Sequence, residues 1–382
     1  MKKYKGTSNN FGDVVLGIVT RQPWTIKRKG HILVSEDVPL FPVGFRGIVH
    51  TNVSDNKKLP AIKVQPNDLR MLSEGDCISL NQNGTVAVLW ENRSPMNAFL
   101  LTESCDCRCL MCPQPPKVHN KSLVETSREI LHLVNPTATQ IICITGGEST
   151  LLNDDFFDFL TLIQEKCPKS PIMLLTNGKS FSDFSFTKKF IAVKPKNLLV
   201  CVSLHSDIDE VHDKIVGVNG SFYKTAMGLQ NLARFRQLVE IRVVISKLNA
   251  DRLESIANFI IRNFPFINHC AFMGMEITGY ARKNYTDIWI DPSDYEEQLF
   301  KAVRTISRSK LKVSIYNIPL CLIRPTAWNF ARKSISGWKN EYLPICSSCS
   351  VKKECCGIFT TSGAFQSVRI KPIISTTSLG IN

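Results

Sequence analysis

Cysteines are the residues of this sequence best suited to chemistry, and eight of the 14 are crowded into two short stretches. Cys105, Cys107, Cys109 and Cys112 lie within SCDCRCLMCP, and four more lie between residues 346 and 356. Cys105, Cys109 and Cys112 have the spacing C-x3-C-x2-C, which leaves Cys107 as the odd thiol. Cysteine thiolates at short spacings hold iron–sulfur clusters, and three ligands leave a fourth corner open. Structural zinc is the main alternative, although it usually takes four ligands.

The composition favours metal ligands over disulfides. The chain has 382 residues, no apolar run long enough to span a bilayer, and no apolar secretory segment after its basic start MKKYK. We therefore expect a cytoplasmic protein with no membrane partner, in which clustered cysteines bind metal or take part in catalysis. The net charge is +14, but the basic residues are spread out, so nucleic-acid binding is not favoured.

Two patterns of secondary structure follow each other along the chain. Residues 1–95 contain short β-rich runs (HILVSE, FRGIVHT, AIKVQP, CISLNQ and TVAVLWE), with a hairpin predicted at Asn83-Gly84, and are predicted to form a small β domain. Apolar runs then alternate with segments of helical periodicity, which predicts an α/β fold with a parallel sheet. The six predicted strands are 98–103, 140–145, 171–176, 198–204, 239–246 and 271–277.

The unusual residues of this second pattern fall at the ends of the predicted strands, where parallel α/β folds place their chemistry. The cysteine loop follows the first strand, and Gly146-Gly147-Glu148 follows the second. Glycines allow a close approach to a ligand, and the Glu148 carboxylate can accept hydrogen bonds from an ammonium group. A tight turn is the plainer interpretation. The other candidates are Asn177, Ser203, His205 and Arg242.

The cysteine motif followed by GGE resembles the radical S-adenosylmethionine (SAM) superfamily. The resemblance implies a partial (β/α)6 TIM-type barrel and a [4Fe–4S] cluster held by Cys105, Cys109 and Cys112. It further implies that the open iron binds SAM, and that one electron cleaves SAM to a 5′-deoxyadenosyl radical that abstracts a substrate hydrogen. Cys107 departs from the family pattern, and we expect a free thiol turned away from the cluster.

The same resemblance implies a SAM-binding role for several strand-end residues. Gly146, Gly147 and Glu148 would contact the methionyl group, Ser203 and His205 would lie near the ribose or carboxylate, and Arg242 would reach the carboxylate. Asn177 is included as a cofactor-binding residue, and the GMEITG run after the sixth strand would pass the adenine.

The second cysteine stretch, PICSSCSVKKECCGIF, resembles the auxiliary-cluster extensions (SPASM or twitch type) of radical SAM enzymes that modify peptides. Cys346, Cys349 and Cys355 would be ligands of a second iron–sulfur cluster. Position 359 is Phe where a further cysteine is expected, so Cys321 or Cys356 must complete the set. Zinc remains an alternative at this site. The predicted divisions are 1–95, a barrel over 96–320, and a Cys-rich extension over 321–382.

A narrower resemblance is to the C-type maturases of the His-Xaa-Ser system. It covers LTESCDCRCLMCPQPP (101–116), GGEST (146–150), MGMEITGYA (273–281) and CSSCSVKKECCGIF (346–359). Ser149 stands where the family commonly has Pro. The resemblance implies a substrate peptide or small protein with His-Xaa-Ser repeats, sister maturation proteins, and an electron donor such as flavodoxin or ferredoxin.

Two other functions fit parts of the sequence. A radical SAM enzyme acting on RNA or a small metabolite would account for the positive charge. A non-catalytic, zinc-binding interaction protein would account for the cysteines alone. The N-terminal β domain could dock a peptide by adding a strand to its sheet, or could serve only as a structural lid.

Overall fold

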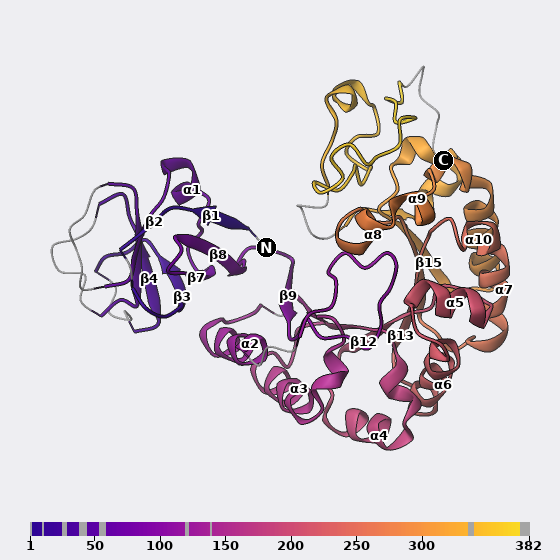
Figure 1. Cartoon of the computed structure of the whole chain (residues 1–382), viewed down its shortest axis with the longest axis horizontal. Helices are drawn as coiled ribbons and strands as arrows, with labels where there is room; N and C mark the ends of the chain where they lie inside the picture. The colour runs from indigo at the N-terminus through magenta and orange to yellow at the C-terminus, as the bar shows by residue number, and fades with distance from the viewer. Residues whose placement is uncertain are drawn as a thin grey trace.

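The framework of the protein is two β-sheets that follow each other along the chain (Figure 1). The computed structural model describes residues 2–9, 11–24, 29–37, 44–52, 59–118, 122–137, 140–334 and 340–374. Within these residues each sheet has eight strands. No described helix is both long enough and apolar enough to cross a membrane.

The N-terminal sheet is mixed, and the first residues of the chain close it. β1 and β2 are separated only by Gly6 and pair with the two opposite edges, β8 and β6. A Cβ at Gly6 would lie 2.0 Å from the carbonyl oxygen of Lys63, so this crossing requires glycine. The elements are β1 (Lys3–Lys5), β2 (Thr7–Ser8), β3 (Val15–Thr20), β4 (His31–Val34), β5 (Gly47–His50), β6 (Ala61–Lys63), α1 (Pro66–Arg70), β7 (Cys77–Leu80) and β8 (Thr85–Trp90).

Each of the five β-rich runs of this region contains a strand, and the predicted hairpin joins β7 to β8. Its loop is longer than a two-residue Asn-Gly turn, because residues 81–84 lie between Leu80 and Thr85. Gly84 takes the positive φ of 78°. β1 and β2 were not predicted, since they are short and polar and form only through distant partners.

The second sheet is entirely parallel, with its strands in sequence order from β9 to β16. β9 and β16 are not paired with each other in the described residues, so the curved sheet is an open barrel. Its strands are β9 (Met96–Leu100), β10 (Ile141–Thr145), β11 (Ile172–Thr176), β12 (Leu198–Ser203), β13 (Val239–Val244), β14 (His269–Met273), β15 (Lys312–Tyr316) and β16 (Ala331–Arg332).

Helices cover the outer side of the curved sheet (Figure 1). α10 shows why they do so: its buried residues Leu299, Ala302, Val303 and Ile306 recur at helical spacing and form one apolar stripe. The helices are α2 (Ser122–Leu133), α3 (Asp154–Lys166), α4 (Phe184–Val193), α5 (Asp209–Val216), α6 (Ser221–Arg234), α7 (Leu253–Asn263), α8 (Gly279–Lys283), α9 (Tyr285–Ile288) and α10 (Glu296–Arg308).

The α/β prediction with a parallel sheet is confirmed, but the strand count of six is wrong, because β15 and β16 extend the sheet. β16 has only two residues and exists through pairing with β15. The first strand also ends at Leu100 rather than at residue 103. Leu101 instead donates its N–H to Thr145 at 3.0 Å, which starts the contact between the cysteine loop and the loop after β10.

The chain beyond β15 is mostly irregular and lies beside α8 and α9 (Figure 1). Its described structure consists of β16, the 3₁₀ turns η5 (Leu320–Leu322), η6 (Pro325–Phe330) and η8 (Pro344–Ser348), and an isolated bridge between Glu341 and Ile358. Phe365 packs edge-on against Tyr285 of α9 at 5.0 Å, and Thr361 donates to Glu276 at 2.9 Å. The extension therefore touches the GMEITG run.

Candidate active site

The cysteine loop after β9 is fixed by main-chain hydrogen bonds to other barrel loops. Gly147 and Glu148 donate their N–H groups to Thr102 and Ser104 at 2.7 and 2.8 Å. On another side, Arg108 donates to Val216 at the end of α5 at 2.9 Å. These hydrogen bonds therefore join the loop that carries the thiols to the turn after β10 and to the end of α5, both far away in the sequence.

The close approach of the cysteine loop requires glycine at positions 146 and 147. A Cβ on Gly147 would lie 2.2 Å from the carbonyl oxygen of Ser104, and one on Gly146 would lie 2.6 Å from that of Thr102. The sequence predicted a close approach at these glycines. In the structure the approaching group is the backbone that leads into the cysteine loop.

Glu148 is buried, with 1% of its surface exposed, and its carboxylate joins three parts of the site. Oε1 accepts from the hydroxyls of Thr150 and Thr176 at 2.8 Å each, and Oε2 accepts from the N–H of Asn177 at 2.7 Å. Burial raises the pKa of Glu148 to about 7, against the lowering effect of these bonds. The carboxylate thus ties the end of β10 to the end of β11.

Asn177 and Lys179 connect the end of β11 to the cysteine loop. Asn177 donates from Nδ2 to the Asp106 carboxylate at 2.8 Å. Lys179, only 7% exposed, makes a 2.9 Å ion pair with Asp106 and donates to its carbonyl oxygen at 3.1 Å. Sequence reasoning did not identify Lys179 or Asp106. The only signal was position: Lys179 follows a predicted strand end, and Asp106 lies between two cysteines.

Cys107 behaves differently from the three predicted ligands. Cys105, Cys109 and Cys112 are partly exposed, whereas Cys107 is buried, with 2% exposed. Hydrogen bonds with the thiols of Cys105 and Cys109 lower the pKa of Cys107. Nδ2 of Asn177 lies 3.6 Å from its sulfur. The prediction that this thiol turns away is therefore wrong: its sulfur lies within 4.8 Å of that of Cys105, one of the predicted ligands.

His205 is buried beyond the end of β12 and joins neighbouring elements. Its Nδ1 accepts from the N–H of Val244 at 3.3 Å, and its own N–H donates to His212 Nδ1 at 3.2 Å. Burial lowers the pKa of His205 to about 3, so the ring is neutral. Ser203 is half-buried at the end of the same strand, in register with Arg242.

A cavity of about 430 Å³ fills the inside of the open barrel. Pro113 and Gln114 of the cysteine loop line it, as do Arg242, Glu276 and Thr278. Its walls are largely apolar strand residues, among them Met96, Ala98, Cys143, Met173, Leu175, Ala271 and Met273. The structure therefore brings Arg242 and the GMEITG run to one cavity beside the cysteine loop. Gly146, Gly147, Glu148, Asn177, Ser203 and His205 do not line it.

Arg242 is held at this cavity by a buried chain of polar groups. Its Nε donates to Glu240 at 2.5 Å, the second oxygen of Glu240 lies 2.6 Å from His269 Nδ1, and His269 Nε2 lies 2.9 Å from the Ser314 hydroxyl. Burial would raise the pKa of Glu240, but His269 and Arg242 hold it at about 2. Glu240 therefore stays charged and fixes the guanidinium.

The cysteine loop has the donor set that a three-ligand iron–sulfur cluster requires. Three partly exposed thiols lie on one rigid loop that borders a cavity, and the buried cation of Lys179 lies beside them. A cluster with three thiolates carries negative charge, which a buried cation stabilises. The residues present therefore fit a cluster at this place.

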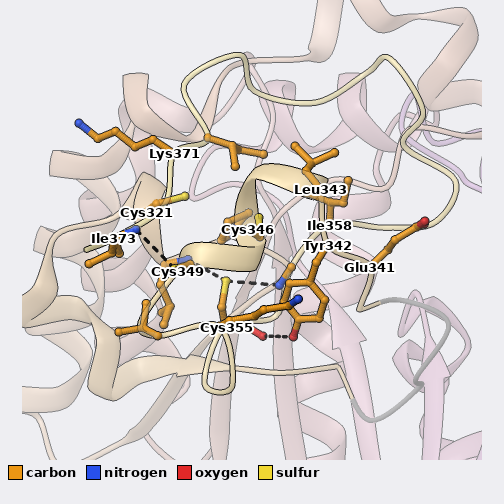
Figure 2. A pocket seen from close by; sticks show the side chains of 16 residues that line it. Cys321, Glu341, Tyr342, Leu343, Cys346, Cys349, Cys355, Ile358, Lys371 and Ile373 are labelled. Atoms are coloured by element: carbon orange, nitrogen blue, oxygen red, sulfur yellow. Dashed lines mark hydrogen bonds between the residues drawn. The ribbon is translucent and has the colours of Figure 1, made fainter. Parts of the chain in front are cut away.

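The second group of cysteines forms a separate site, the C-terminal cysteine site (Figure 2). Cys321, Cys346, Cys349 and Cys355 gather around one enclosed cavity whose other walls include Tyr342 and apolar side chains such as Leu320, Leu343, Val351, Ile358, Ile370 and Ile373. The cavity has room for about 20 Å³. No three of the four sulfurs lie within 4.8 Å of one another, so a single tetrahedral ion would require the thiols to move closer together.

Main-chain N–H groups point at the sulfurs of this site. Cys355 accepts from the N–H groups of Leu320 and Gly357, both at 3.4 Å. The hydrogen bond from Cys356 and these two N–H groups lower the pKa of Cys355 to about 6, against burial. Cys356 does not line the cavity, and its thiol donates to the Gly357 carbonyl at 3.3 Å. Of the two candidates for the fourth position, the structure brings Cys321 to the other three.

Comparison with known proteins gives distant likenesses. No family model matches the chain. Over 197 residues it is 24% identical to the antilisterial bacteriocin subtilosin biosynthesis protein AlbA of Bacillus subtilis (strain 168). That alignment covers 50% of this chain and 43% of AlbA, so the chain spans less than half the length of this relative.

Several solved structures are similar to the chain, and two of them serve as examples. One is SuiB of Streptococcus suis bound to S-adenosylmethionine, with a TM-score of 0.48 and 18% identity over 59% of this chain and 51% of that one. The other is anSMEcpe with bound AdoMet and the Cp18Cys peptide, with a TM-score of 0.45 and 19% identity over 58% of this chain and 62% of that one.

Proposed function

We propose that this chain is a radical SAM enzyme that modifies a ribosomally made peptide. The observation that carries the proposal is the C-x3-C-x2-C loop, which is hydrogen-bonded to the GGE turn. This loop lies beside a barrel cavity that Arg242 lines. Similarity to a protein named for the biosynthesis of a bacteriocin supports a peptide as the class of substrate.

In this proposal Cys105, Cys109 and Cys112 hold a [4Fe–4S] cluster. When bound, that cluster supplies the electron for reductive cleavage of SAM. The Arg242 guanidinium, held by Glu240, is placed to bind a carboxylate in the cavity.

The remaining strand-end residues divide into two proposed roles. Gly146, Gly147 and Glu148 present backbone to the methionyl group, and Ser203 lies toward the ribose. Because their hydrogen bonds go to neighbouring loops, the side chains of Glu148, Asn177 and His205 hold this backbone in place.

We further propose that Cys321, Cys346, Cys349 and Cys355 hold an auxiliary metal centre. Four thiolates suit an iron–sulfur cluster or zinc, and we favour iron–sulfur because the first site uses the same chemistry.

The narrower resemblance leads to proposals about partners. The substrate would carry His-Xaa-Ser repeats, sister maturation proteins would act beside the enzyme, and flavodoxin or ferredoxin would supply electrons in the cytoplasm. The proposed divisions are 1–95, 96–320 and 321–382, with the auxiliary centre in the last.

The test is anaerobic purification followed by metal analysis and assay of SAM cleavage with a repeat-bearing peptide and with RNA. We expect a brown protein that absorbs at about 400 nm, as iron–sulfur proteins do, and modifies only the peptide. A colourless protein that holds zinc and still cleaves SAM fully would overturn the proposal. Tight, salt-sensitive RNA binding would instead favour an RNA substrate.

A further inference from the structure

The C-terminal cysteine site has a wall that does not come from the cysteine motif. Residues 367–374, here called the 367–374 strap, run along the cavity, and Ile370, Lys371 and Ile373 line it (Figure 2). No cysteine lies in the strap, and nothing in the spacing of the cysteines predicts that it belongs to the site.

One N–H group of the strap points at a proposed ligand sulfur. Ile373 donates its N–H to the sulfur of Cys349 at 3.4 Å. The carbonyl oxygen of Ile373 accepts from both the N–H and the hydroxyl of Ser350, at 2.9 and 2.8 Å. Residue 373 is therefore bound through both main-chain polar groups to the consecutive residues Cys349 and Ser350.

Pro372 precedes the donor residue and helps to fix the strap. As proline it has no N–H that would need a partner there. Proline also keeps the preceding residue, Lys371, extended.

Such N–H groups matter to a thiolate metal centre in two ways. They orient the ligands and offset the negative charge of the sulfurs, and at iron–sulfur clusters hydrogen bonds to sulfur help to set the reduction potential. With the donors to Cys355, two of the four thiols receive main-chain N–H groups, and the one on Cys349 comes from the strap.

We propose that the 367–374 strap is a built part of the auxiliary metal centre, and that the amide of Ile373 holds the thiolate of Cys349 for metal binding. This inference rests on the proposed auxiliary centre, but it does not depend on whether the metal is iron or zinc.

The test compares Ile373→Pro, which removes the donor, with Ile373→Ala, which keeps the N–H and removes only the side chain. Ile374→Pro places a proline one residue further on, where no hydrogen bond to sulfur is lost. Each change is made in the full chain with Cys105, Cys109 and Cys112 replaced by Ala, so that bound metal reports the C-terminal cysteine site alone. Samples are loaded with ferrous iron and sulfide, or with zinc, and titrated with a chelator.

We expect Ile373→Pro to lose about tenfold or more in metal affinity, as is typical for lost outer-sphere hydrogen bonds. Any iron cluster that still forms should have a lower reduction potential. Ile374→Pro should match the parent in both measurements, and Ile373→Ala, which removes part of the cavity wall but keeps the N–H, should lose less affinity than Ile373→Pro. Equal affinity and potential in Ile373→Pro and Ile373→Ala would overturn the role of the strap while leaving the auxiliary centre intact. A parent protein that binds neither metal would overturn both.

Discussion

In the cysteine loop after β9, a charged residue lies between the thiols and is held by polar side chains, whereas most of the side chains that line the C-terminal cysteine site are apolar. Asn177 and Lys179 contact Asp106 of the first loop. At the second site, hydrogen bonds to sulfur come from the main-chain N–H groups of Leu320, Gly357 and Ile373. Three protein ligands leave a metal site open to a small molecule, and four close it.

The two sites also depend on the fold in different ways. The cysteine loop is held by the ends of parallel strands, so any change in those strands reaches the thiols through Glu148 and Asn177. The C-terminal cysteine site depends on a few irregular segments beside the barrel. We therefore expect changes at one site to leave the metal of the other in place.

The largest expected effect is the loss of one activity when a cysteine of one site is replaced. Cys109→Ala should abolish SAM cleavage, because a cluster cannot be held by the two remaining thiols. Cys349→Ala should leave SAM cleavage near the parent level and abolish modification of the peptide. The measurement is anaerobic assay of 5′-deoxyadenosine and of modified peptide from the same samples. Loss of SAM cleavage in both variants would contradict the independence of the sites.

The next effect concerns the stability of the loop framework. Glu148→Ala leaves the hydroxyls of Thr150 and Thr176 and the N–H of Asn177 without their buried acceptor. We expect a loss of roughly 2–4 kcal/mol in the free energy of unfolding, since an unsatisfied buried group costs about 1–3 kcal/mol. Glu148→Gln keeps one acceptor oxygen and should lose less. Urea unfolding of the metal-free proteins measures both, and equal stability of Glu148→Ala and the parent would contradict the role of the carboxylate.

A smaller effect tests the buried charge beside the cysteine loop. Lys179→Met removes the cation that pairs with Asp106, and we expect about tenfold weaker binding of iron at this loop. Lys179→Arg keeps the charge and should lose less. Iron titration in a Cys321→Ala, Cys349→Ala background measures the loop alone. Unchanged binding in Lys179→Met would show that the cation does not support the cluster.

The smallest effect identifies the fourth ligand of the C-terminal cysteine site. Cys356→Ala should retain the metal, because this thiol does not line the cavity, whereas Cys321→Ala should lose it. Metal content after gel filtration distinguishes the two variants. The opposite result would assign the fourth position to Cys356.

Much of the barrel could be predicted from the sequence because its strands are short apolar runs between helices of clear periodicity. β15 and β16 were missed because the first begins with the exposed Lys312 and the second is stable only through its partner. The N-terminal sheet was predicted as β-rich, but its closure through Gly6 depends on two strands that are distant in the sequence.

The sequence by itself determined that the clustered thiols form two groups and which loop of the parallel sheet carries the first, because both follow from spacing and from the order of strands and helices. Only the tertiary structure decided that Cys321 rather than Cys356 joins the second group, that Cys107 lies among the first thiols, that Lys179 is buried beside them, and that the 367–374 strap reaches the second group. The physical reason is the same in each case. These contacts join residues far apart in the chain, or depend on side-chain direction, and neither leaves a periodic signal in the sequence.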